Sequence, residues 1–157
     1  MNTYKAPLKD MQFVLFNVLN AEQQYSALKF ENTERELLEA ILQEAANFAE
    51  NVLAPINSSG DAEGCHFDKA SGQVRTPAGF KQAYSQFVES GWSGLTASDA
   101  LGGQGMPESL ACVFKEMIDA ACLSWGNYPL LSHGAVEALK HHGNAWPDGA
   151  SSSRRHT

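Results

Sequence analysis

The chain changes direction between two expected helices through Gly91-Trp92-Ser93-Gly94-Leu95 and Gly102-Gly103-Gln104-Gly105-Met106-Pro107. Glycine readily takes the left-handed conformation that stops a helix, so Gly91 is expected to end the helix before this loop. Proline suits the first turn of a helix, where its missing N–H is not required, so Pro107 is expected to open the next one. The loop therefore separates the two halves of a helical chain.

The most regular helical pattern precedes this loop. Thr33-Glu34-Arg35-Glu36 matches a capping box, in which the threonine and glutamate side chains satisfy free amides at the start of a helix. Apolar residues then recur every three or four positions on one face. They are Leu38, Ile41, Ala45, Phe48 and Val52, widened by Leu37, Leu42, Ala49 and Leu53. Pro55 is expected to end this helix.

Shorter helices are expected on either side. Pro7 opens an apolar segment from Leu8 to Leu19, which favours a helix packed against a neighbour over a membrane anchor. Thr76 and Pro77 are expected to cap and open the helix that ends at Gly91. Further helices are expected over residues 107–123 and, after breaks at Gly126 and Pro129, up to Gly143; a weak hairpin signal joins Phe67 and Val74.

These elements predict an all-α bundle of about five or six helices over residues 1–143. From Asn144 to Thr157 the chain contains no Leu, Ile, Val, Met or Phe. Such a segment buries too little apolar surface to offset the entropy of ordering it, so residues 144–157 are expected to be disordered.

The composition limits the function. The chain has 157 residues, of which 43% are hydrophobic and 18% charged, as in a globular domain. A net charge of −7 with scattered Lys and Arg argues against nucleic-acid binding. The longest apolar run, Phe13 to Phe16, is far shorter than the ~20 residues of a membrane span. Three cysteines without a signal peptide lead us to expect a cytoplasmic chain.

Two segments are candidates for a binding site. The loop Gly102, Gly103, Gln104 and Gly105 precedes a helix, and free amides there could cradle a phosphate, although the spacing alone favours an ordinary helix connection. Asn127, Leu130, Leu131 and Gly134 share a helix face at spacings of three and four. That face could line an apolar ligand pocket or belong to the core.

Other chemistries have little support. Cys65-His66, Cys112, Cys122 and His141-His142 lack the paired spacing of a zinc site, so no metal ligand is predicted. No serine lies in a G-x-S-x-G motif, so a hydrolytic triad is not predicted either.

The glycine-rich loop and several short motifs resemble the N-terminal helical domain of the acyl-CoA dehydrogenases. The motifs are Leu53-Ala54-Pro55, Thr76-Pro77-x-Gly79-Phe80 and Tyr4-Lys5-Ala6-Pro7-Leu8. The resemblance extends over residues 1–143 and is greatest to the longer bacterial type related to 3-methylmercaptopropionyl-CoA dehydrogenase. One departure is Ser98-Asp99-Ala100-Leu101, where the family often carries a tyrosine before the glycines.

The resemblance implies a flavin-dependent dehydrogenation of an acyl-CoA thioester, with FAD as cofactor. In that family the matching glycine-rich loop lies near the mouth of the active site, and the helix that matches Asn127, Leu130, Leu131 and Gly134 lines the acyl pocket. The catalytic carboxylate comes from a C-terminal helical domain, and the flavin is held mainly by a middle sheet domain and C-terminal helices. No catalytic residue is therefore assigned here.

The chain is accordingly expected to be an N-terminal fragment, truncated or frameshifted after about residue 143. It would contribute one wall of the acyl-CoA site and neither retain FAD nor turn over substrate alone. The alternative is a non-catalytic helical module that binds a protein through Trp92, Trp125 and Tyr128. With Leu131 these side chains are expected to form an exposed apolar face, which predicts self-association.

Overall fold

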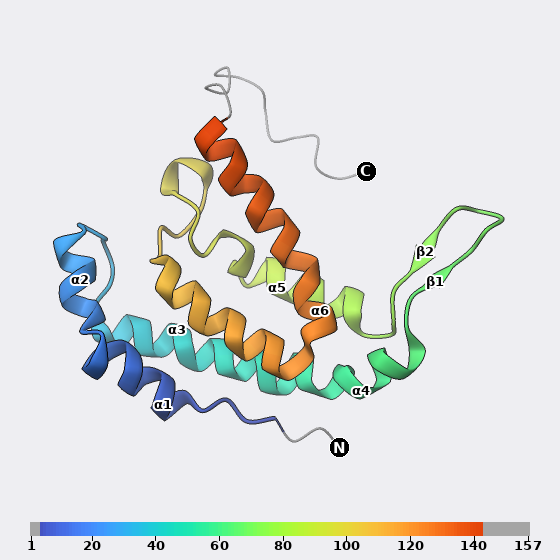
Figure 1. The fold of residues 1–157 in the computed structure, drawn as a ribbon, viewed down its shortest axis with the longest axis horizontal. Helices are drawn as coiled ribbons and strands as arrows, with labels where there is room; N and C mark the ends of the chain where they lie inside the picture. The colour runs from blue at the N-terminus through green and yellow to red at the C-terminus, as the bar shows by residue number, and fades with distance from the viewer. Residues whose placement is uncertain (1–3, 143–157) are drawn as a thin grey trace.

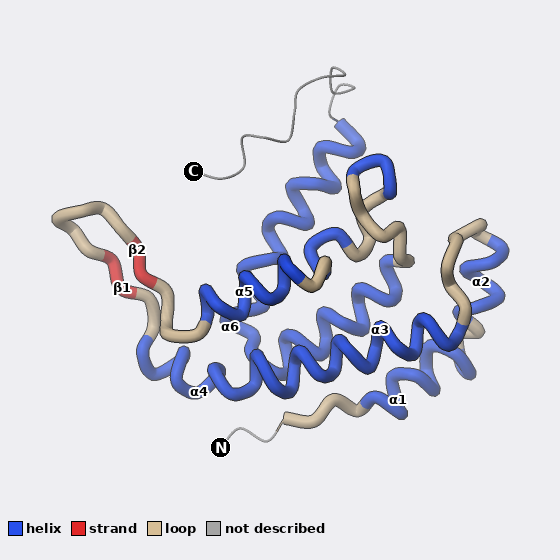
Figure 2. The backbone as a smooth tube through the Cα atoms, turned by 180° about the vertical axis from the view of Figure 1, so that it is seen from behind, coloured by secondary structure: helices blue, strands red, loops and turns tan. Residues whose placement is uncertain are grey.

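The computed structural model describes residues 4–142, so the expected change of character after Asn144 lies outside the described residues (Figures 1 and 2). The elements in chain order are α1 (Leu8–Gln12), η1 (Phe13–Val18), α2 (Ala21–Ala27), α3 (Arg35–Phe48), η2 (Ala49–Leu53), α4 (Ala54–Glu63), β1 (His66–Phe67), β2 (Val74–Arg75), α5 (Phe80–Glu89), η3 (Trp92–Gly94), η4 (Asp99–Leu101) and α6 (Glu108–His142). The all-α prediction is confirmed, with one small hairpin added.

The helices pack around a long central rod formed by α3, η2 and α4. The first part of α6 lies along this rod and contacts all three of its segments, while α1 packs against α3 (Figure 1). The hairpin of β1 and β2 projects away from the body (Figure 2). The core is therefore a set of contacts between helices, and the hairpin contributes little to it.

The central helix begins and ends differently from the prediction. Glu34 is the N-cap residue, and no side chain caps the helix, so the capping box at Thr33 does not form. Pro55 does not end the helix, because the chain widens into the π-helical turn η2 and Pro55 lies in the first turn of α4. A proline is tolerated there since its missing N–H falls where a helical hydrogen bond is already interrupted.

The apolar face of this helix is largely as predicted. Residues of the widened stripe form its most buried part, and Ile41 and Val52 lie half-buried at the edge. The buried members of the predicted face are Leu38, Leu42, Ala45, Phe48, Ala49 and Leu53, and Ala46, which was not predicted, is buried beside them. Leu37 is exposed, so the face is centred slightly away from the predicted one.

Aromatic rings fill the centre of the core. The Phe48 ring lies 6.1 Å from the ring of Phe87, 6.3 Å from that of Phe114 and 5.8 Å from that of Trp125, centroid to centroid. Trp125 is 0% exposed, and its indole Nε1–H donates a hydrogen bond to the carbonyl of Phe80, 3.2 Å away. Such ring pairs stabilise a fold beyond the apolar area that they bury. They join α3, α5 and both parts of α6.

Helix α5, which precedes the glycine-rich loop, starts later than predicted. Its N-cap residue is Gly79, with φ at 85°, so Thr76 and Pro77 precede the helix and do not open it. Gly91, with φ at 79°, follows the helix and confirms the predicted stop. Phe80, Ala83 and Phe87 form its buried face.

Helix α6 reverses direction at Cys122, whose φ of −160° and ψ of 84° are not helical. The reversal divides α6 into a first arm (residues 108–121) and a second arm (residues 123–142), which Figure 1 shows as two segments meeting at an angle. The predicted breaks at Gly126 and Pro129 are wrong, because both residues lie inside the second arm. Gly126 instead permits close packing: an added Cβ would lie 2.5 Å from the Asp119 Oδ1 atom.

The N-terminal segment packs on the central rod. Met11, Leu15 and Phe16 are buried, whereas Val18 and Leu19 at the end of the apolar segment are exposed. The Glu50 carboxylate accepts hydrogen bonds from the Lys5 ammonium group and from the Ala6 amide, the second at 3.0 Å. The bond from Lys5 is the main reason why the pKa of Glu50 is lowered.

The hairpin prediction is confirmed, since Phe67 pairs with Val74 and His66 with Arg75 in an antiparallel register. Among residues 4–142, no helix is both long and apolar enough to cross a membrane.

We expect Phe48→Ala to lower the free energy of unfolding by about 3–5 kcal/mol, because the substitution leaves a cavity beneath three rings. Denaturant titration of the purified chain measures this change. Phe13→Ala is the control, since Phe13 is 58% exposed and its loss should change stability by no more than about 0.5 kcal/mol. A cost below about 1 kcal/mol for Phe48→Ala would contradict the described core.

Candidate functional site

The glycine-rich loop is closed by its own hydrogen bonds. The amides of Gly102 and Gly103 donate to Asp99 and Ser98, at N···O distances of 2.9 and 3.1 Å. Those of Gln104, Gly105 and Met106 donate to Gly94, Ala97 and Leu95, each at 2.9 Å. All five consecutive amides are therefore used within the loop, and the phosphate-cradle hypothesis finds no free donors there.

Gly103 is the residue that this compact loop requires. A Cβ atom at position 103 would lie 2.1 Å from the carbonyl oxygen of Ala97 and 2.4 Å from its carbonyl carbon. Gly102 and Gly105 take the left-handed conformation, with φ of 76° and 63°. The glycines therefore serve the fold of the connection, which is the ordinary alternative considered from the sequence.

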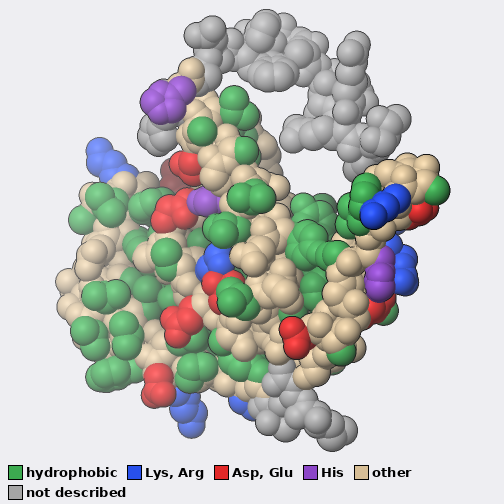
Figure 3. Space-filling view, turned by 45° about the vertical axis from the view of Figure 1, so that its right-hand side comes forward, with side chains coloured by type: hydrophobic (Ala, Val, Ile, Leu, Met, Phe, Trp, Pro, Cys, Tyr) green, Lys and Arg blue, Asp and Glu red, His purple; other side chains and the backbone are tan. Residues whose placement is uncertain are grey.

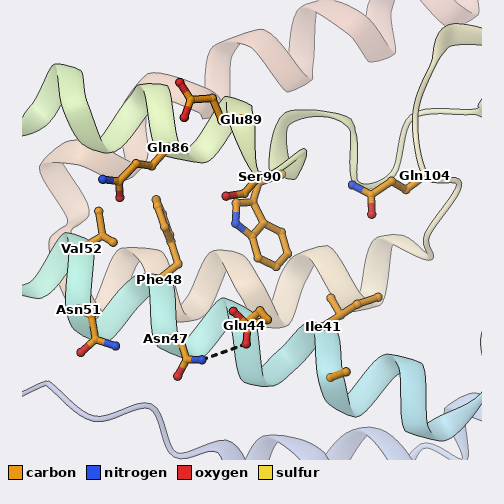
Figure 4. Close-up of a pocket in the computed structure, with 12 residues that line it drawn as sticks. Ile41, Glu44, Asn47, Phe48, Asn51, Val52, Gln86, Glu89, Ser90 and Gln104 are labelled. Atoms are coloured by element: carbon orange, nitrogen blue, oxygen red, sulfur yellow. Dashed lines mark hydrogen bonds between the residues drawn. The ribbon is translucent and has the colours of Figure 1, made fainter.

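A groove of about 710 Å³ lies between the central rod and α5 (Figure 4). Its lining residues are Ala40, Ile41, Glu44, Asn47, Phe48, Asn51, Val52, Gln86, Glu89, Ser90, Trp92 and Gln104. Phe48 points from α3 toward α5, and Gln104 reaches the groove from the loop (Figure 4). The Gln104 side chain donates to the Gly91 carbonyl at 2.9 Å, which fixes it at this edge.

The groove is lined by aromatic rings and by polar side chains. Trp92 packs on Phe114 with ring centroids 4.3 Å apart, and Phe48 belongs to the core cluster. Amides and the carboxylates of Glu44 and Glu89 surround these rings. Of the residues predicted for the site, Gln104 alone lines this groove.

Gly102, Gly103 and Gly105 lie in the loop, and the remaining four predicted residues lie on the second arm of α6. Asn127, Leu130, Leu131 and Gly134 are exposed, with Leu130 43% and Leu131 79% exposed. An added Cβ at Gly134 would meet no atom within 4 Å. Figure 3 shows hydrophobic side chains along this arm on the face toward the viewer. These residues therefore form an open surface and are not part of the core.

A smaller hollow of about 370 Å³ lies at the base of the second arm. It is lined by Val74, Thr76, Phe80, Lys81, Tyr84 and Tyr128. The Tyr128 hydroxyl lies 3.7 Å from the Cys65 sulfur atom. Burial raises the pKa of Tyr128, and the contact with Cys65 raises it further. The hairpin and the second arm thus meet at this hollow.

One contact links the second arm to the start of α6, just after the glycine-rich loop. His133 on the second arm lies 3.8 Å from the carboxylate of Glu108, the second residue after Met106.

The groove residues of α3 and α5 were not predicted as a site, because their sequence pattern is that of a core-facing helix stripe. No motif in the sequence signals them.

The sequence comparisons agree with the fold. The family model described as "Acyl-CoA dehydrogenase, N-terminal domain" matches residues 35–146. The chain is 34% identical over 137 residues to 3-methylmercaptopropionyl-CoA dehydrogenase of Ruegeria pomeroyi, covering 87% of this chain and 23% of that enzyme. It is 28% identical over 118 residues to the broad-specificity linear acyl-CoA dehydrogenase FadE5 of Mycobacterium tuberculosis, covering 75% of this chain and 19% of that enzyme.

The structure is therefore that of an all-α domain. It combines an exposed helical arm with a glycine-rich loop that is closed by its own hydrogen bonds. The family match identifies it: the chain belongs to the acyl-CoA dehydrogenase family and carries the family's N-terminal domain. It spans roughly a fifth to a quarter of the length of the two curated relatives.

We expect Gly103→Ala to destabilise the chain by at least about 1–3 kcal/mol, since the added methyl group must displace the Ala97 backbone. Gly134→Ala is the matched control, because it adds the same methyl group in open space within a helix and should stabilise by about 0.5–1 kcal/mol. Thermal unfolding of the two variants measures the difference. Equal effects would contradict the described packing of the loop.

Proposed function

We propose that the chain supplies one wall of the acyl-CoA site in a flavin-dependent acyl-CoA dehydrogenase. Family membership and the names of both relatives support this proposal. The observation that carries it is the exposure of Leu130 and Leu131 beside the side-chain-free position Gly134. Burying a leucine side chain contributes about 1.5–3 kcal/mol, so a bound hydrocarbon chain would gain affinity from this surface.

The reaction needs groups that we place outside this chain. Dehydrogenation requires a carboxylate that removes the α-proton and a flavin that accepts the β-hydride. The glycine-rich loop does not fit the pyrophosphate of FAD, because its five amides already donate within the loop. We therefore propose that the chain alone retains no FAD and does not turn over substrate.

The alternative is a non-catalytic module that binds a protein partner. The structure removes one of the residues expected to contact that partner, because Trp125 is buried. Tyr128 and Leu131 are exposed and could contact it. A colourless chain that binds a specific protein would favour this alternative. If the chain restores flavin-dependent activity when it is placed in a complete enzyme, the result would favour the proposed role in an acyl-CoA site.

The proposed function predicts different results for the chain alone and for the chain within an enzyme. The purified chain should show no flavin absorbance, no saturable FAD binding and no acyl-CoA-dependent dye reduction. A chimera in which it replaces the 137 matched residues of the Ruegeria pomeroyi enzyme should bind flavin and reduce the dye. Stoichiometric flavin or turnover in the isolated chain would contradict the proposal.

The same chimera tests the acyl-chain wall. Leu131→Asp should lower kcat/KM at least about tenfold, which corresponds to 1.4 kcal/mol, while the flavin content stays unchanged. Leu28→Asp is the control, since Leu28 is 69% exposed on the loop after α2, and it should leave kcat/KM unchanged. Equal activity of the two variants would place the acyl chain elsewhere.

We also propose that the isolated chain self-associates through the second arm, where Leu123, Leu131 and Leu139 are exposed. Sedimentation velocity should show a concentration-dependent increase in mass. Leu131→Glu should reduce it, and Phe67→Glu on the projecting hairpin should not. A monomer at all concentrations would contradict this proposal.

A further inference from the structure

The reversal at Cys122 brings together side chains that are distant in sequence. Close packing begins at Gly126, where an added Cβ would lie 3.0 Å from the Ile118 Cγ2 atom. Further along the second arm, the His133 Nε2 atom lies 3.8 Å from the Glu108 Oε2 atom on the first arm. The two arms therefore face each other at this position through polar, metal-ligating side chains.

We propose that Glu108, His133 and Glu137 bind a divalent transition-metal ion, with zinc as the ion that suits them best. One oxygen of each carboxylate and one imidazole nitrogen all lie within 4.8 Å of one another. A zinc ion takes such donors at about 2.0–2.2 Å, so the ligands of one tetrahedral ion lie about 3.3–3.5 Å apart. His133 and Glu108 are mostly exposed, which lets their side chains rotate through the remaining distance.

The spacing in the sequence favours chelation. His133 and Glu137 are four residues apart on one helix, so their side chains project from the same face. Glu108 supplies the third ligand from the opposite arm. Zinc accepts both imidazole nitrogen and carboxylate oxygen as ligands, and three protein ligands would leave the fourth tetrahedral position to water.

Charge gives a second argument. Glu137 is half-buried, whereas the side chains between residues 127 and 139 are mostly exposed, and it lies near the second carboxylate, Glu108. A divalent cation bound between the two carboxylates would be attracted by both of them. The His133 imidazole can pair with Glu108 as an ion pair only when protonated, whereas it binds a metal in its neutral form.

The site would join the two arms of α6. Between residues 127 and 139 no side chain of the second arm is buried, so little apolar packing holds its outer part to the first arm. A metal ion shared by both arms would fix that part against the first arm, in the position that the proposed acyl-CoA wall occupies. The metal site does not depend on that function, because it can be tested on the isolated chain.

The experiment titrates the purified full chain with zinc in the presence of a competing chelator and a phosphine reductant. We expect saturable binding of one ion per chain and a higher melting temperature with zinc. Cobalt(II) in place of zinc should give the visible absorption of a low-symmetry N/O site. His133→Ala and Glu137→Gln should each weaken zinc binding at least about tenfold and abolish the rise in melting temperature.

His66→Ala is the control, since His66 lies on the exposed hairpin beside Cys65 and could bind a surface metal ion. It should change neither the affinity nor the shift in melting temperature. Circular dichroism establishes that the variants fold, which their partly exposed positions favour. Absence of saturable binding, binding that survives His133→Ala, or binding that is lost in His66→Ala would overturn the proposal.

Discussion

The burial of Trp125 is the contact on which the shape of this domain depends. The side chain follows the non-helical residue Cys122 by three positions and is fully enclosed. Its ring packs on Phe48 and Phe87, and its N–H group bonds to the carbonyl of Phe80. Leaving the buried indole N–H without an acceptor would cost about 1–3 kcal/mol of folding stability. The hydrogen bond to Phe80 therefore fixes the orientation of the buried ring. The base of the second arm is thereby attached to α3 and α5.

The rest of the second arm follows from that attachment. Since only its base is anchored in the core, its outer part presents Leu130, Leu131 and neighbouring residues on an open surface. This surface is the basis of the proposed acyl-CoA wall and of the proposed self-association. His133 and Glu137 follow Leu130 by three and seven positions on the same helix, so the polar cluster that they form with Glu108 lies next to the apolar surface. One reversal of the chain therefore creates both features.

The sequence predicted several features that depend on local patterns, although the capping box at Thr33 and the helix start at Thr76 and Pro77 did not form as predicted. The apolar stripe around Leu42 and Phe48, the stop at Gly91 and the Phe67–Val74 hairpin are all confirmed. Features that depend on tertiary packing were not predicted. Trp125 was expected at the surface, and breaks in the helix were expected at Gly126 and Pro129 because those residue types usually break helices. The core instead sets the reversal at Cys122, and Gly126 is needed for close packing of the arms. The predicted site residues stay proposals, and exposure supports only those on the second arm: Asn127, Leu130, Leu131 and Gly134.

The most direct test of this account is the solvent exchange rate of the Trp125 indole N–H, measured by NMR with assignment by a Trp125→Phe variant. The account predicts slow exchange, together with a nuclear Overhauser contact from the indole ring to the ring of Phe48, because the group is buried and bonded to Phe80. Trp92, which is only half-buried, provides the internal reference. Exchange of Trp125 as fast as that of Trp92, without the contact to Phe48, would contradict the described reversal of α6.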